Sequence, residues 1–182
     1  MLNIPNTLTL LRIAAIPAIL IALDAQRTDL ALVLFVAAGF TDGLDGAIAR
    51  LTNSKTELGA FLDPLADKGL VLVLLIKLTL LGLVEGWVLT IILTRDIVCI
   101  SGYMILYFLT GEAIPIRPSL AGKLATFIQL LGVAGGLLCL WRPTILPTEV
   151  TALIFAVAAG VTALAGIQYV ARGLRWYQER PA

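Results

Sequence analysis

The sequence predicts an all-α integral membrane protein with six transmembrane helices, and three observations lead to this prediction. The chain of 182 residues is 59% hydrophobic and only 14% charged, whereas a soluble domain usually carries about 25% charged residues. Two segments, Leu124–Trp141 and Val150–Ala171, contain no charged residue, and each is long enough to cross a hydrocarbon core of about 30 Å. Open strands cannot span lipid, and the alternating pattern of a membrane barrel is not visible in the sequence.

Four further apolar segments precede these two and complete the six helices. They are interrupted by charged residues, but each is about as long as a membrane-spanning helix. Their expected ranges are Leu8–Leu23, Leu30–Arg50, Gly59–Leu81 and Trp87–Leu109. The sequence contains no internal repeat and no low-complexity stretch, so we expect one membrane domain over residues 1–182.

The basic residues in the connections predict how the helices are oriented. Seven of them fall on one side of the membrane: Arg50, Lys55, Arg117, Lys123, Arg172, Arg175 and Arg180. The other side receives only Arg27 and Arg142. Because basic residues are enriched on the cytoplasmic side, the first side is predicted to be cytoplasmic, and both termini lie there. Lys77, late in the third helix, is expected to extend its amine to the outer membrane surface.

The composition also excludes several classes of function. The formal net charge is +1, so the chain lacks the basic excess of a nucleic-acid-binding protein. The sequence contains no histidine, which excludes histidine bases, nucleophiles and metal ligands. Cys99 and Cys139 both fall within apolar runs and are interpreted as buried hydrophobic residues, without a disulfide framework.

Four aspartates inside predicted spans are the exception to this apolar pattern. Asp42 and Asp45 are three residues apart in the second helix, and Asp63 and Asp67 are four apart in the third. Each pair therefore shares one face of its helix. Measured from the cytoplasmic ends of the two helices, Asp42 and Asp67 both lie roughly 12 Å deep. The sequence thus places four carboxylates at matching depth on neighbouring antiparallel helices.

Four uncompensated carboxylates would be costly to bury in a membrane, and two divalent cations would neutralise them. Oxygen ligands alone favour Mg²⁺ or Mn²⁺ over zinc. A pair of such ions is suited to phosphoryl displacement chemistry. Small residues around the aspartates leave room for a ligand: Gly43, Gly46, Ala49, Gly59 and Ala60. The glycines alone would more often mark helix packing, and the aspartates alone could line the cation pathway of a transporter.

The complete string of motif residues resembles a known family signature. It reads Asp42-x2-Asp45-Gly46-x2-Ala49-Arg50-x8-Gly59-x3-Asp63-x3-Asp67, and it is similar, position for position, to the signature of the CDP-alcohol phosphotransferases. Six helices with this motif on the second and third are also typical of that family. The resemblance therefore covers essentially the whole chain.

The resemblance implies an enzyme that transfers a phosphatidyl group from CDP-diacylglycerol to an alcohol acceptor lipid in the bacterial inner membrane. Its active site faces the cytoplasm, and a homodimer is expected. Asp42, Asp45 and Asp63 are expected to bind two Mg²⁺ or Mn²⁺ ions. Asp67 is expected to bind a metal and to act as the general base on the acceptor hydroxyl. The expected CDP contacts are Pro5, Asn6, Thr7, Thr9, Gly46, Ala49, Arg50, Thr56 and Gly59.

The acceptor alcohol is inferred from the fourth and fifth helices, with Arg95, Asp96, Arg117 and Lys123 as the expected contacts. The branch of the family that uses glycerol 3-phosphate typically has a further arginine in the fourth helix, but this chain has no basic residue between Arg95 and Arg117. That branch also typically has a second lysine in the fifth helix, where this chain has Ala125. We therefore expect phosphatidylglycerol as acceptor, giving cardiolipin and CMP. The alternative is glycerol 3-phosphate, giving phosphatidylglycerol phosphate, and a divalent-cation transporter is a remote second alternative.

Overall fold

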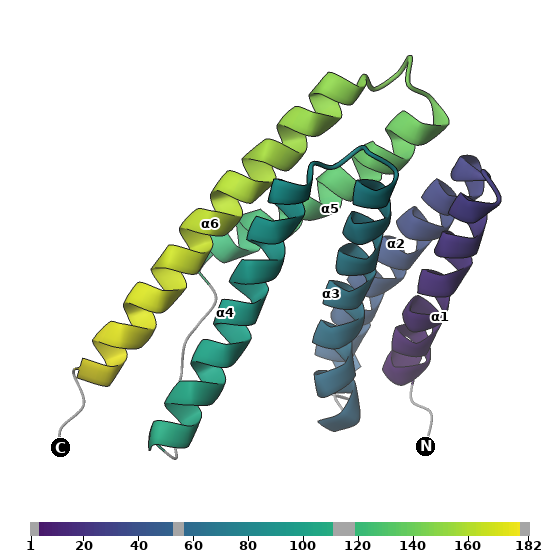
Figure 1. Ribbon diagram of the computed structural model, residues 1–182. Helices are drawn as coiled ribbons and strands as arrows, with labels where there is room; N and C mark the ends of the chain where they lie inside the picture. The colour runs from purple at the N-terminus through teal and green to yellow at the C-terminus, as the bar shows by residue number, and fades with distance from the viewer. Residues whose placement is uncertain (1–3, 53–56, 111–118, 179–182) are drawn as a thin grey trace. The chain divides into compact units, whose positions relative to one another are not determined.

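The computed structural model describes the backbone of residues 4–52, 57–110 and 119–178, and the side chains of residues 11–41, 68–110 and 119–178. Over this part of the chain, six helices follow one another along the sequence (Figure 1). They are α1 (Ile4–Asp24), α2 (Thr28–Thr52), α3 (Glu57–Leu80), α4 (Gly86–Thr110), α5 (Leu120–Trp141) and α6 (Thr148–Gln178). Each predicted helix corresponds to one of them, so the all-α fold predicted from the sequence is confirmed.

The helices of the second half carry the clearest membrane character. Among the described residues, α4, α5 and α6 are each long and apolar enough to cross a membrane. Large apolar side chains on α4 are exposed, such as Phe108 at 76% and Ile97 at 63%. A soluble protein rarely exposes so many large apolar groups together, whereas lipid would cover them. These features indicate a membrane protein, and the number of spans stays a prediction.

The chain divides into two compact units, the first comprising Met1–Leu83 and Val133–Thr151. In this unit α1, α2 and α3 alternate in direction (Figure 1), and α1 packs against both of the others. Leu74, Leu75 and Leu78 of α3 are fully buried in its core. The second half of α5 completes the unit, where Gly136 allows close approach to Leu78.

Two helices of this unit end in the same way. Gln26 after α1 and Gly82 after α3 have positive φ angles of 57° and 78°. In each case the next residue donates its backbone N–H to a carbonyl five residues earlier, from Arg27 to Ala22 and from Leu83 to Leu78. These hydrogen bonds satisfy carbonyl groups that a helix end would otherwise leave free.

Ion pairs form at the end of α1, the start of α2 and the end of α3. Lys77 of α3 forms an ion pair with Asp24, the last residue of α1. Arg27 donates a hydrogen bond to Asp29 in the first turn of α2, and this bond lowers the pKa of the Asp29 carboxyl. A negative charge at this position is also favourable because it lies at a helix N-terminus.

The second unit comprises Val84–Gly132 and Ala152–Ala182. Within it α4 and α6 run in the same direction (Figure 1), and glycines bring them close together. Gly102 of α4 faces Tyr169, and Gly166 of α6 faces Arg95. The first half of α5 packs on α6, where the buried side chain of Gln129 donates a hydrogen bond to Thr162 at 2.8 Å.

Gly132→Ala is expected to destabilise the second unit by about 1–3 kcal/mol, the usual effect of overpacking. A Cβ atom at this position would lie 2.8 Å from Cε1 of Phe155. Phe155 is 1% exposed, so its ring has little room to move. Thermal unfolding of the detergent-solubilised protein measures the effect. Gly160→Ala on α6 is the matched control because its Cβ would meet no atom within 4 Å, and equal midpoints for the two variants would contradict this description of the packing.

Candidate metal and substrate sites

The four aspartates expected to bind metal lie in two continuous helices of the first unit. Asp42 and Asp45 belong to α2, while Asp63 and Asp67 belong to α3. Asp42 lies ten residues before the end of α2, and Asp67 lies ten residues after the start of α3. At about 1.5 Å per residue, both lie about 15 Å from the helix ends that residues 53–56 connect.

The residue types at these positions fit two divalent cations. Within each helix, spacings of three and four residues place the two aspartates on a common face. The donor set consists only of carboxylates, which suits Mg²⁺ or Mn²⁺. The side chains of all four aspartates lie outside the described residues, so their role as metal ligands stays a prediction.

The residues expected to contact CDP come from three segments of the same unit. Pro5, Asn6, Thr7 and Thr9 lie in the first turns of α1. Gly46, Ala49 and Arg50 lie near the end of α2, and Gly59 lies in the first turn of α3. Figure 1 shows the start of α1, the end of α2 and the start of α3 at the same end of the unit. The side chains of these residues, and all of Thr56, lie outside the described residues.

Arg95 and Asp96, two of the expected acceptor contacts, form an ion pair on α4. Nη1 of Arg95 lies 2.6 Å from Oδ1 of Asp96, and the two side chains are 18% and 27% exposed. The pair belongs to the second unit and lies in the middle of an apolar helix. A charge at such a position is costly, and the ion pair partly offsets its cost.

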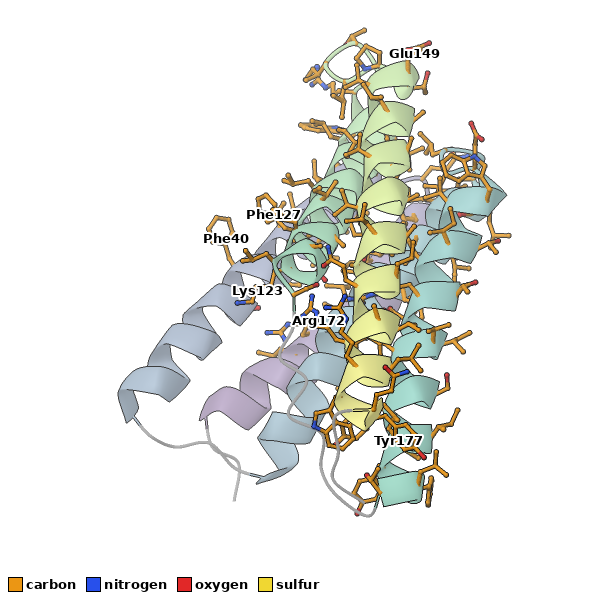
Figure 2. The ribbon with its side chains drawn as sticks, turned by 90° about the vertical axis from the view of Figure 1, so that its left-hand side faces the viewer. Phe40, Lys123, Phe127, Glu149, Arg172 and Tyr177 are labelled. Carbon is orange, nitrogen blue, oxygen red and sulfur yellow. The ribbon has the colours of Figure 1, made fainter. Side chains whose placement is uncertain are left out.

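Lys123, the third described acceptor residue, lies in the first turn of α5 and is exposed. Ser119 caps this helix: its Oγ accepts a hydrogen bond from the backbone N–H of Gly122 at 2.9 Å. Figure 2 shows Lys123 at this end of α5 and Arg172 on the second half of α6. Arg117, the remaining expected acceptor contact, lies outside the described residues.

Ala125 has a structural explanation that the sequence did not reveal. It is 1% exposed, and Gln129, one turn further along α5, is 8% exposed. Both residues therefore lie on the buried face of the helix. A lysine at position 125 would direct its stem into the packed interior, so packing is sufficient to explain the alanine. The alanine at position 125 therefore does not by itself argue against a phosphorylated acceptor.

A cavity of about 590 Å³ lies between α4 and α6 of the second unit. Apart from Thr90, Thr94 and Arg95, its lining is made of aliphatic residues and glycine. Thr90 donates its hydroxyl to the carbonyl of Gly86 in its own helix. The cavity is therefore mainly apolar, and Arg95 is its charged residue among those described.

Comparison with known proteins identifies relatives over most of the chain. The family described as CDP-alcohol phosphatidyltransferase matches residues 2–165. A protein of Mycobacterium tuberculosis named "Probable phosphatidylglycerophosphate synthase" is 40% identical, over 95% of this chain and 82% of its own length. A Bacillus subtilis protein named CDP-diacylglycerol–glycerol-3-phosphate 3-phosphatidyltransferase is 33% identical, over 94% of this chain and 95% of its own length.

A third relative carries a different name. A Mycobacterium bovis protein provisionally named cardiolipin synthase is 35% identical to this chain. The similarity extends over 72% of this chain and 62% of that protein. The relatives named phosphatidylglycerophosphate synthase and glycerol-3-phosphate 3-phosphatidyltransferase therefore match a larger part of the chain than the one named cardiolipin synthase.

Proposed function

The chain belongs to the CDP-alcohol phosphatidyltransferase family, and from this membership we propose that it transfers the phosphatidyl group of CDP-diacylglycerol to glycerol 3-phosphate. The products are phosphatidylglycerol phosphate and CMP. The observation that carries this choice of acceptor is the similarity, over more than nine tenths of the chain, to two proteins named for that reaction. It favours the alternative expectation from the sequence over the main one.

The described acceptor residues are compatible with a phosphorylated alcohol. Glycerol 3-phosphate carries a phosphomonoester with nearly two negative charges at neutral pH. Arg95 and Lys123 would supply cationic hydrogen-bond donors for it, which form stronger bonds than neutral donors. The burial of Ala125 gives a packing reason for the absence of a lysine at that position, so Ala125 alone does not favour phosphatidylglycerol over a phosphorylated acceptor.

The proposed reaction is a single displacement at phosphorus. Asp67 accepts the proton of the acceptor hydroxyl, and the oxygen forms a bond to the lipid-bearing phosphorus. The bond from that phosphorus to the bridging oxygen breaks, and CMP leaves with the electron pair. Arg50 holds the negative charge of the departing CMP. Two divalent cations held by Asp42, Asp45, Asp63 and Asp67 would neutralise the pyrophosphate.

The orientation proposed with this function follows from the basic residues. All six helices span the bacterial inner membrane, and the end that holds the aspartates faces the cytoplasm. This proposal is supported by the seven basic residues on one side against two on the other. A homodimer stays a prediction from the family resemblance.

Cardiolipin synthesis is the second candidate, favoured by the relative provisionally named for it. A panel of acceptors distinguishes the two. Purified enzyme with radiolabelled CDP-diacylglycerol is offered glycerol 3-phosphate, phosphatidylglycerol, inositol and serine in parallel, and the lipids are separated by thin-layer chromatography. We expect phosphatidylglycerol phosphate as the main product. Cardiolipin formed from phosphatidylglycerol, without product from glycerol 3-phosphate, would assign the second function instead.

A further inference from the structure

Arg95 is held in a narrow passage between two glycines on neighbouring helices. A Cβ atom on Gly166 of α6 would lie 3.3 Å from Cγ and 3.7 Å from Cβ of Arg95. A Cβ atom on Gly122 of α5 would lie 3.3 Å from Nη2. The stem of Arg95 therefore passes Gly166, and its guanidinium reaches the first turn of α5, next to Lys123 in the sequence.

The guanidinium of Arg95 also forms an ion pair with the adjacent Asp96. Nη1 is paired with Asp96 at 2.6 Å, and the side chain is 18% exposed. Nε is buried and has no hydrogen-bond partner among the described residues. A buried donor without a partner is unfavourable, so hydrogen bonding at Nε does not account for the path of the stem. The space beside Gly166 explains that path more directly.

We infer that Gly166 is a positioning residue for acceptor binding, because it leaves the space through which Arg95 reaches its place at α5. This inference rests on the proposed role of Arg95 as an acceptor contact. A methyl group at position 166 would force the Arg95 stem to move by a few tenths of an ångström. Charge-assisted hydrogen bonds depend on the geometry of the guanidinium, so the displacement should weaken the acceptor complex and leave CDP-diacylglycerol binding unchanged.

The same helix offers two matched controls. A Cβ atom on Gly173 would also lie 3.3 Å from a side chain of α4, but that side chain is Leu106. Gly173→Ala therefore imposes a contact of equal tightness between the same two helices without touching Arg95. Gly160→Ala adds a methyl group to α6 in open space. Gly173→Ala measures the effect of tighter packing between the helices, and Gly160→Ala measures the effect of helix propensity. An effect through Arg95 is the part that neither control reproduces.

The test measures KM for the acceptor and for CDP-diacylglycerol, together with kcat, in Gly166→Ala, Gly173→Ala and Gly160→Ala. We expect Gly166→Ala to raise the acceptor KM about 3- to 10-fold, equivalent to a partial loss of one charged hydrogen bond. Its KM for CDP-diacylglycerol and its kcat at saturating acceptor should stay within about twofold of wild type. The two controls should leave the acceptor KM unchanged.

The double variant with Arg95→Ala tests whether the effect passes through Arg95, because alanine lacks both Cγ and the guanidinium. If it does, adding Gly166→Ala to Arg95→Ala should raise the acceptor KM no further, because contacting residues are not additive. Independent multiplication of the two effects would overturn the inference. Equal KM changes in Gly166→Ala and Gly173→Ala, an unchanged KM in Gly166→Ala, or failure of Gly166→Ala alone to fold would also overturn it. The comparison uses whichever alcohol the acceptor panel identifies, so a different acceptor would overturn the proposed function alone.

Discussion

Asp67→Asn is expected to reduce phosphatidyl transfer by about 10²–10⁴-fold, the usual effect of losing a general base. The amide cannot accept the proton of the acceptor hydroxyl. It also removes one of the four negative charges that the paired cations require, so both proposed roles of Asp67 are lost together. The measurement is the initial rate of phosphatidylglycerol phosphate formation by purified enzyme at saturating concentrations of both substrates.

Asp29→Asn provides a matched control for this substitution. Asp29 lies in the first turn of α2, outside the metal-binding motif, and forms an exposed ion pair with Arg27. An exposed ion pair contributes little to stability, so this variant should keep nearly full activity. Retention of more than about a tenth of wild-type activity in Asp67→Asn would remove Asp67 from the role of base.

Removal of divalent metal is expected to abolish transfer completely and reversibly. Four carboxylates without their cations would repel one another and the pyrophosphate of the substrate. Excess chelator should therefore eliminate activity, and Mg²⁺ or Mn²⁺ should restore it. Zn²⁺ should restore it poorly, since an all-oxygen site lacks the nitrogen and sulfur ligands that zinc prefers.

Circular dichroism in the same samples distinguishes loss of the cofactor from loss of the fold. The helical signal should survive chelation, because apolar packing of the helices does not depend on the metal. Full activity in excess chelator would rule out the paired-cation site. Restoration by Zn²⁺ as effective as restoration by Mg²⁺ would show that the ligands are not the four carboxylates alone.

The helices were predictable because length and apolar composition determine a membrane span. The predicted segment Leu30–Arg50 became α2 with two more residues at each end, Thr28–Thr52. α6 continues seven residues beyond the predicted end at Ala171. The extension includes Arg172 and Arg175, whose charges marked the end of the apolar span although the helix itself continues past them.

Contacts between distant residues could not be read from the sequence. The prediction that Lys77 extends toward the surface did not identify its partner Asp24, which is 53 residues away. Nor does any local pattern indicate that Gln129 bonds to Thr162, or that Gly166 makes room for Arg95. These contacts depend on which faces of the helices pack together. The helical repeat of apolar residues along the sequence does not show which helix packs against which.

The acceptor is the point that the sequence determines least. Ala125 is compatible with a missing phosphate contact, but the residue is also buried on the packed face of α5. A single position can reflect either packing or substrate, and its burial was needed to choose between them. The aspartate motif was less ambiguous because charges inside an apolar span have few structural explanations.

The most direct test of the proposed reaction follows the oxygen of the acceptor. Glycerol 3-phosphate labelled with ¹⁸O in its hydroxyl groups is incubated with CDP-diacylglycerol and enzyme, and both products are examined by mass spectrometry. If the acceptor hydroxyl attacks the lipid-bearing phosphorus, the phosphatidylglycerol phosphate contains the label in its new phosphodiester linkage and the CMP contains none. Labelled CMP, or a new phosphodiester linkage without the label, would contradict the proposed reaction.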